Sequence, residues 1–245
     1  MARAARAKAE SGFHHVTARG NGGLTLFEDS TDYRAFLGFL RDACSKYHVT
    51  LRAYCLMTNH VHLLLDDPED GMPQVMKSAL GSYALRYNAR TGHIGHVFQQ
   101  RYDNQPIETE EYLLQALRYI HNNPAKAGIC PAGEYLWSSF HEYASGTGAY
   151  CDVDLILELL GGKGRFLEFS EVEDASFRPQ HRPRVSDAAA REIAQRVLGD
   201  IALVDLQTVG RSSRNELLAS LKDAGLSVRQ IERLTGIGRS IIARA

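Results

Sequence analysis

Residues 50–65 read TLRAYCLMTNHVHLLL, and this stretch says most about the fold. Two β-prone runs, Thr50 to Met57 and His60 to Leu65, stand on either side of the dipeptide Thr58-Asn59. Two strands that are joined by so short a turn pair with each other in an antiparallel hairpin. The sequence therefore predicts an antiparallel sheet, with this hairpin in it.

Two histidines in the hairpin stand where leucine or valine would serve a core strand. Residues two apart in a strand point to the same side, so His60 and His62 share one face. Val61, Leu63 and Leu65 would then fill the core on the other face. Neutral imidazole is a common protein ligand for divalent metals, and two on one face can share an ion. Two half-exposed strand histidines explain the same pattern, which by itself is a weak signal for a metal site.

The segments around the hairpin predict an antiparallel sheet with helices on one face. Phe13 to Arg19 predicts a strand, and Val97 to Asp103 a further one. Helices are expected at Thr31 to Tyr47 with Ser30 as its N-cap, at Pro73 to Arg90, and at Thr109 to Asn122 with Thr109 as its cap. This succession is that of an α+β sandwich and differs from the alternating pattern of a parallel sheet.

A change of character near residue 150 predicts three parts. Residues 1–150 would form the α+β domain, and residues 151–187 a helical connector and linker that contains FRPQHRPRVSD. Residues 188–245 would form an all-α domain. From Gln207 onward this last part carries seven Lys or Arg residues against three acids, a surplus that suits a surface for nucleic acid.

The end of the chain, GLSVRQIERLTGIGRSII at 225–242, resembles a helix-turn-helix. Ser227 would cap the first helix, Gly236 permits a tight turn, and Ser240 would begin the second helix. In that arrangement Arg239, Ser240 and Arg244 face DNA. The alternative is a small helical bundle that serves as a lid or a dimer contact.

Composition sets wider limits on the function. The 245 residues are 44% hydrophobic and 23% charged, with a net charge of −1, which neither supports nor excludes nucleic-acid binding. Four scattered cysteines without a CxxC pair indicate neither a disulfide scaffold nor a zinc knuckle. No apolar run approaches the roughly 20 residues of a membrane span. We expect a cytoplasmic protein with no membrane partner.

A second group of candidate residues lies on the helix expected at Thr109 to Asn122. Tyr119 and Asn123 are four apart, about one helical turn, so they face the same way. The amide oxygen of Asn123 is a hard ligand that suits Mg or Mn, and the phenol of Tyr119 can attack phosphorus once deprotonated. A core tyrosine followed by an Asn-Pro helix end explains the same residues.

Several motifs, taken in order, resemble the REP-associated tyrosine transposases, which are relatives of the single-tyrosine transposases in the HUH endonuclease superfamily. These motifs are FHHVTARGN (Phe13 to Asn21), HVH (His60 to His62), GHVFQQRY (Gly95 to Tyr102), YIHNNPAKAG (Tyr119 to Gly128) and WSSFHEY (Trp137 to Tyr143). The resemblance covers the chain from Phe13 to Tyr143 and implies a ferredoxin- or RRM-like HUH nuclease domain.

The resemblance also implies a chemistry for the site. Tyr119 would be the nucleophile that attacks a DNA phosphodiester, giving a 5′-phosphotyrosine and a free 3′-OH. His60, His62 and Asn123 would hold a divalent ion, Mg or Mn, that polarises the phosphate. The chain would then be a metal-dependent transposase that cleaves and rejoins single-stranded DNA.

The DNA itself would be held by residues outside this set. Arg19 and Asn21 would grip single-stranded DNA beside a REP-like hairpin, while Arg101 and Tyr102 would contact phosphate and stack a base. The helical domain would hold flanking duplex. We place the protein at the bacterial nucleoid, as a monomer or a homodimer.

Two other classes of function fit parts of the sequence. One is a sequence-specific DNA-binding regulator with a vestigial nuclease site, and the other is a hydrolase that acts through metal-activated water. Four further histidines receive a structural interpretation; they are His14, His15, His93 and His96. The strand of His14 and His15 should neighbour the hairpin, so one of these two could approach the site.

Overall fold

The computed structural model describes residues 9–171, 187–199, 201, 203, 205–224, 226, 228–238, 241 and 242. The chain divides into two compact units, Met1–Pro179 and Gln180–Ala245. Each unit has its own cluster of buried apolar side chains, as separate domains do.

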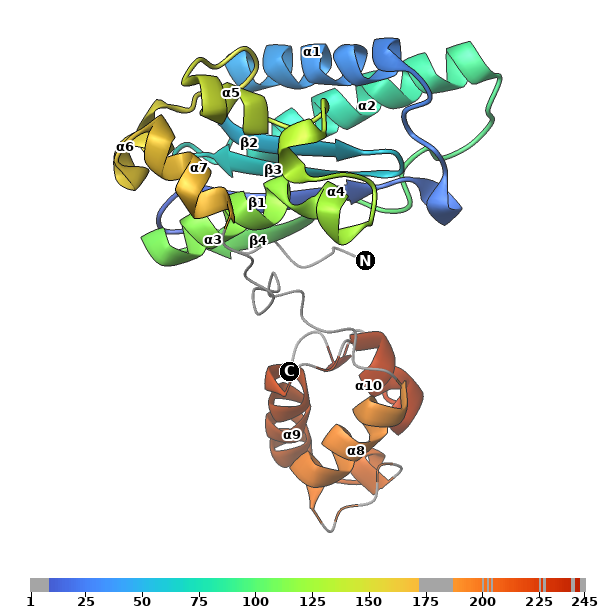
Figure 1. The fold of residues 1–245 in the computed structure, drawn as a ribbon. Helices are drawn as coiled ribbons and strands as arrows, with labels where there is room; N and C mark the ends of the chain where they lie inside the picture. Colours follow the sequence, from blue (N-terminus) through green and yellow to red (C-terminus); the bar gives the residue numbers. More distant parts are fainter. Residues whose placement is uncertain are drawn as a thin grey trace. The chain divides into compact units, whose positions relative to one another are not determined.

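The first unit is built on a four-stranded antiparallel sheet (Figure 1). The strands neighbour one another in the order β2 (Thr50–Met57), β3 (His60–Asp66), β1 (Phe13–Arg19) and β4 (Asp103–Ile107). Strands β2 and β3 form the predicted hairpin. The α+β class is thereby confirmed, and the HVH motif lies on one of the two central strands.

The edge strand β4 lies later in the chain than the sequence predicts. A strand was expected at Val97 to Asp103, whereas β4 begins at Asp103 and Phe98 makes an isolated bridge to Gly20. The residues of β4 have low strand propensity, and Pro106 lacks an N–H group. Because β4 pairs with β1 alone, an edge position tolerates this proline.

Helices cover both faces of the sheet, where the sequence predicts one covered face. Helices α1 (Ser30–Lys46) and α2 (Met72–Thr91) lie on one face, and α3 (Glu110–His121) and α4 (Asn123–Lys126) on the other (Figure 1). The physical reason is visible in β3, whose three consecutive leucines at 63–65 are all fully buried. Since successive side chains alternate between the faces, both faces of this strand need cover.

The cap of α1 also differs from the prediction. Asp29 is the N-cap, and its carboxylate accepts hydrogen bonds from the backbone N–H groups of Thr31 and Asp32. Ser30 is instead the first residue of the helix. A carboxylate is a strong acceptor for two N–H groups at once, and it also carries the charge that a helix start favours.

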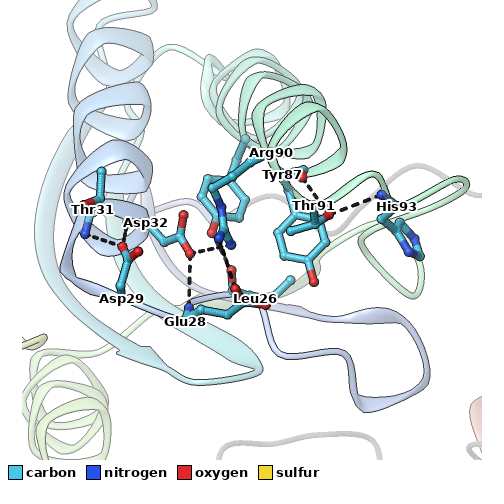
Figure 2. A network of polar contacts seen from close by, with 10 residues as sticks. Leu26, Glu28, Asp29, Thr31, Asp32, Tyr87, Arg90, Thr91 and His93 are labelled. Atoms are coloured by element: carbon cyan, nitrogen blue, oxygen red, sulfur yellow. Dashed lines mark hydrogen bonds and ion pairs between the residues drawn. The ribbon is translucent and has the colours of Figure 1, made fainter.

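A buried acid ties the two helices of this face together (Figure 2). The carboxylate of Asp32, which is 1% exposed, accepts hydrogen bonds from the Arg90 guanidinium at 2.8 Å and from the backbone N–H of Glu28 at 3.1 Å. Arg90 also reaches the Glu28 carboxylate at 3.0 Å. The end of α2 is thus fixed against the start of α1.

The helices expected in a connector belong to the first unit. Helices α6 (Asp154–Leu160) and α7 (Lys163–Glu171) follow α5 (Phe140–Ser145), and Phe166 of α7 is fully buried in the first core. A short 3-10 turn, η2 (Ala132–Glu134), precedes α5. The linker stretch between α7 and residue 187 lies outside the described residues.

The second unit is helical in its described residues. Its elements are α8 (Asp187–Leu198), the 3-10 turn η3 (Asp205–Gln207), α9 (Arg211–Asp223) and α10 (Val228–Thr235). Apolar side chains of these helices form its core, with Ile231 of α10 fully buried. The all-α class expected for the end of the chain agrees with this.

Candidate active site

The pairing of β1 with β3 places two pairs of residues on the face that α3 covers. Thr17 lies directly opposite His62, and Arg19 directly opposite His60. Directly opposed residues of an antiparallel pair project to the same side. The basic side chain of Arg19 therefore shares a face with both histidines of the HVH motif.

Each histidine of the motif is fixed through its Nδ1 atom. His60 donates from Nδ1 to the Oδ1 atom of Asn59 at 2.7 Å. The Nδ1 atom of His62 lies 3.1 Å from Nε2 of His15 and 3.4 Å from the Thr17 hydroxyl. Hydrogen bonds of this kind at Nδ1 set the orientation of an imidazole ring.

His15 is the one of the two β1 histidines that approaches the HVH motif, an alternative that the sequence left open beside the structural interpretation. It is 2% exposed, and its ring stacks on that of His62 with centres 5.3 Å apart. A structural interpretation of His15 thus overlooks its place within the site. Strand alternation carried the signal, because only one of the adjacent His14 and His15 can face the hairpin's histidines. His14 projects to the other face, where its Nδ1 lies 2.9 Å from Oδ1 of Asn104.

Helix α3 carries Tyr119 to these histidines. Thr109 caps the helix as predicted, accepting from the backbone N–H of Tyr112, and the buried Leu113, Leu117 and Ile120 anchor it on the sheet. The ring of Tyr119 then meets that of His62 edge-on, with centres 5.6 Å apart. Helix packing thus brings the phenol of Tyr119, 57 residues after His62 in the sequence, close to the β1–β3 strand pair.

Tyr119 contacts two further groups. Its ring lies edge-on to His15 at 5.8 Å, and the ammonium of Lys126 sits 4.3 Å from its ring centre. An ammonium over an aromatic face is attracted by the ring quadrupole. The tyrosine thus lies between imidazoles on the sheet side and a cation on the helical side.

The electrostatics of the site favour the neutral form of His60. Burial, and after it the positive charge of Arg19, lowers the pKa of His60 to about 4. Burial raises the pKa of Tyr119 above its ordinary value, and the charge of Arg19 acts against that shift. The charge of Arg19 therefore acts to lower the pKa of both His60, a candidate metal ligand, and Tyr119. Neutral imidazole is the form that binds metal.

Asn123 adjoins Tyr119, one turn further along. Its Nδ2 group donates to the backbone carbonyl of Tyr119 at 2.8 Å, and the residue is 9% exposed. Among the residues that the structure describes, no three His, Cys, Asp or Glu side chains form a group that could hold a metal. The predicted ligand set is of another kind, since it joins two imidazoles to one amide oxygen.

The turn after Arg19 is held against the segment that carries Arg101. The backbone N–H of Asn21, in the 3-10 turn η1 (Asn21–Gly23), donates to the Val97 carbonyl at 2.8 Å, and that of Gln99 donates to the Arg19 carbonyl at 2.9 Å. Arg19, Asn21 and Arg101 are all exposed. All four predicted DNA contacts in this unit thus belong to segments that lie together, and three of the four are exposed.

Tyr102 is more covered than the other three predicted DNA contacts of this unit. It is 8% exposed and packs in the hydrophobic core of the first unit, and it also lines a pocket together with Arg101. Stacking on a base requires an accessible ring face. The base contact of Tyr102 stays a prediction.

The predicted contacts of the second unit cannot be placed in the same way. Arg239, Ser240 and Arg244, together with the expected cap Ser227, lie outside the described residues. What is described agrees with a turn after α10: Ile231 is buried, and Gly236 adopts a φ of +70° that favours glycine.

Comparison with known proteins decides the family. Residues 14–123 match the family model described as "Transposase IS200 like". This part of the chain is an IS200-like transposase domain. The matched region of the IS200-like domain begins in β1 and ends at Asn123, so it contains His60, His62 and Tyr119 as well. The family predicted from the motifs is thereby confirmed, and no curated protein gave a match.

Solved structures similar to this transposase include two of low sequence identity. One is described as a REP-associated tyrosine transposase bound to a REP hairpin; it has 17% identity, a TM-score of 0.47, and covers 62% of this chain and 92% of its own. The other is a candidate transposase of Deinococcus radiodurans R1, with 21% identity, a TM-score of 0.35, and coverage of 49% and 97%.

In the described residues of this transposase, no helix is both long enough and apolar enough to cross a bilayer.

Proposed function

We propose that this transposase cleaves and rejoins single-stranded DNA beside hairpins, with Tyr119 as its nucleophile. The observation that carries the proposal is the approach of the Tyr119 ring to His62 at 5.6 Å, on the face where Arg19 lies opposite His60. A phenol, two imidazoles and a guanidinium are together the groups that phosphoryl transfer to a tyrosine needs.

The reaction transfers one phosphoester bond. The Tyr119 oxygen, having lost its proton to solvent or a neighbouring base, forms a bond to phosphorus, while the bond from phosphorus to the 3′-oxygen breaks. The 3′-oxygen takes up a proton and leaves as a 3′-OH, and the 5′-phosphate stays on the tyrosine. Attack by a 3′-OH on this phosphotyrosine reverses the step and joins two strands without ATP. Arg19 stabilises the negative charge on the phenolate and on the phosphate.

His60, His62 and Asn123 would hold a divalent ion, Mg or Mn. The donor set fits such an ion, because hydrogen bonds to both Nδ1 atoms orient the rings and Nε2 is the ring nitrogen that each imidazole would offer to the metal. The amide oxygen of Asn123 adds a hard donor. When bound, the ion would act as a Lewis acid on the scissile phosphate. The chain's own residues orient the phenol beside it.

DNA would be held by two surfaces. Arg19, Asn21 and Arg101 would grip the single strand, since their segments are joined by backbone hydrogen bonds. Arg239, Ser240 and Arg244 of the second unit would contact flanking duplex through a helix-turn-helix. The bound REP hairpin belongs to the similar transposase of known structure, and a hairpin-bearing strand is our proposal for this one. Both a monomer and a homodimer are compatible with this arrangement.

Incubation with a hairpin-bearing oligonucleotide and Mg or Mn tests the proposal. We expect an SDS-resistant protein–DNA adduct that the Tyr119→Phe variant does not form. Tyr112→Phe is the matched control on the same helix, because its hydroxyl bonds to Gln105 of the edge strand β4 at 3.2 Å. A regulator with a vestigial site would bind without cutting, and a water-activating hydrolase would cut without an adduct.

A further inference from the structure

A cavity of about 570 Å³ opens on the helical side of Tyr119. Helix α3 forms one wall, and α4, the turn around Pro131, α5 and α7 form the others. The sheet-side histidines do not line it, so it is separate from the predicted metal site. Tyr119 is therefore a shared wall, with the histidines on one side and the cavity on the other. The volume lies within the range of about 300–1,000 Å³ that is usual for small-molecule sites.

The lining combines apolar walls with cations. Phe140 and Leu167 supply flat and branched apolar surface, and Leu167 is 43% exposed although it is a large hydrophobic residue. Arg118 and Lys126 supply positive charge at the α3 and α4 walls. The ammonium of Lys126 lies 4.3 Å from the Tyr119 ring centre, so this charge is beside the phenol itself.

Polar groups complete the lining. Gln115 and Asn122 add side-chain amides on α3 and just after it, Ser170 adds a hydroxyl, and Glu171 adds a carboxylate that can accept from an amino group. Amides and carboxylates are the groups that hydrogen-bond to the edges of bases, while apolar and aromatic surfaces cover base faces. Cations beside them suit a phosphate.

We propose that this cavity binds a nucleotide of the DNA strand next to the phosphate that Tyr119 attacks. The base would enter between Phe140 and Leu167, and a backbone phosphate would lie at Arg118 and Lys126. The inference rests on the proposed function, because it takes Tyr119 as the point where the strand is held. It adds a base-binding subsite on the helices, distinct from the strand-and-turn surface of Arg19, Asn21 and Arg101.

Such a subsite has a mechanical consequence for the reaction. A nucleotide bound in the cavity would hold the scissile phosphate beside the Tyr119 oxygen. Such positioning keeps the two reacting groups close together and correctly oriented, which speeds the reaction. Since α7 forms one wall, helices outside the matched region 14–123 contribute to specificity.

Titration of the full-length protein with each deoxynucleoside 5′-monophosphate tests the subsite, with inorganic phosphate as a second probe. Leu167→Trp should fill the cavity and weaken nucleotide binding about tenfold or more, a loss of about 1.4 kcal/mol. Phosphate binding should change little. Leu159→Trp is the matched control, because Leu159 is similarly exposed at 38% but does not line the cavity. Equal nucleotide affinities of the two variants would overturn the proposal, as would the absence of nucleotide binding to the wild type.

A second pair of variants guards against misfolding. Ala125→Trp places a ring in the cavity from an exposed position, while Ala127→Trp adds the same ring two residues later, outside the lining. Oligonucleotides with an abasic site on either side of the cleaved bond then tell which flanking nucleotide is bound. If the wild-type protein forms the Tyr119 adduct but Ala125→Trp and Ala127→Trp bind nucleotides equally well, the proposed function stands and the subsite is contradicted. If Ala125→Trp blocks nucleotide binding but the wild-type protein forms no adduct, the subsite stands and the proposed function is contradicted.

Discussion

The Nε2 atom of His15 lies 3.1 Å from the Nδ1 atom of His62, with both side chains buried. This contact connects β1 to the HVH motif on β3 and fixes the ring of a predicted metal ligand. Hydrogen-bond partners of this kind orient a ligand and tune its basicity, so His15 should matter to metal binding without touching the metal.

Replacement of His15 should therefore weaken metal binding. We expect His15→Ala to lower Mn²⁺ affinity by about 10- to 100-fold, as loss of such a partner commonly does. Isothermal titration with Mn²⁺ measures it directly, without DNA. His14→Ala is the control, because His14 projects to the opposite face and contacts Asn104. Equal Mn²⁺ affinities for the two variants would remove His15 from the site.

Arg19 should act on the chemical step more than on binding. Its positive charge acts to lower the pKa of both Tyr119 and His60. We expect Arg19→Gln to slow adduct formation about 100-fold, the usual cost of losing one donor to a developing negative charge. Arg34→Gln, at an exposed position of α1, should leave the rate unchanged. Single-turnover kinetics at saturating DNA separates rate from affinity, and a pure affinity loss for Arg19→Gln would limit Arg19 to gripping the strand.

The ion pair between Asp32 of α1 and Arg90 of α2 should contribute to stability. Asp32→Asn removes the charge that a 1%-exposed carboxylate offers to Arg90. We expect a loss of about 1–3 kcal/mol in the free energy of unfolding, measured by urea denaturation. Asp42→Asn breaks an exposed ion pair with Arg41, so its cost should stay below about 1 kcal/mol. Similar losses for both variants would contradict a special role for the buried acid.

Acid should destabilise the first unit through His121. Burial lowers the pKa of His121 to about 3, while its ordinary pKa is 6.5. As pH falls from about 6.5 toward 3, the unfolded chain takes up a proton that the folded chain does not, so the free energy of unfolding falls. The slope for this group approaches about 1.4 kcal/mol per pH unit.

Denaturation series at several pH values test this linkage. His121→Asn keeps a polar partner for the Ser139 hydroxyl, which bonds to His121 Nε2 at 2.8 Å, yet it cannot titrate. Its pH dependence between 4 and 6.5 should be shallower than that of the wild type by about one proton. An unchanged slope would assign the acid sensitivity to other groups, such as His60, whose pKa is also lowered.

Local patterns in the sequence were sufficient for the hairpin and for helix α3. A two-residue turn between β-prone runs, and a threonine cap before an amphipathic helix, depend on neighbouring residues alone. His60 and His62 on one face follow from strand alternation. These are the features that the structure reproduces, at Thr50–Met57, His60–Asp66 and Glu110–His121.

Features that depend on distant partners were missed. Strand β4 forms because β1 offers an edge, although Pro106 and its neighbours have little strand propensity. The approach of His15 to His62 depends on the register of β1 against β3, and a single sequence does not fix that register. The burial of Tyr102 likewise depends on packing against distant residues.

The proposed chemistry requires that Tyr119 become covalently joined to a 5′-phosphate of DNA. Mass spectrometry of the nuclease-trimmed adduct, after proteolysis, detects this bond itself. We predict that the nucleotide mass is found on the peptide that contains Tyr119, and that Tyr119→Phe yields no modified peptide. A nucleotide on any other residue, or an adduct formed by the Tyr119→Phe variant, would contradict the role of Tyr119 as the nucleophile.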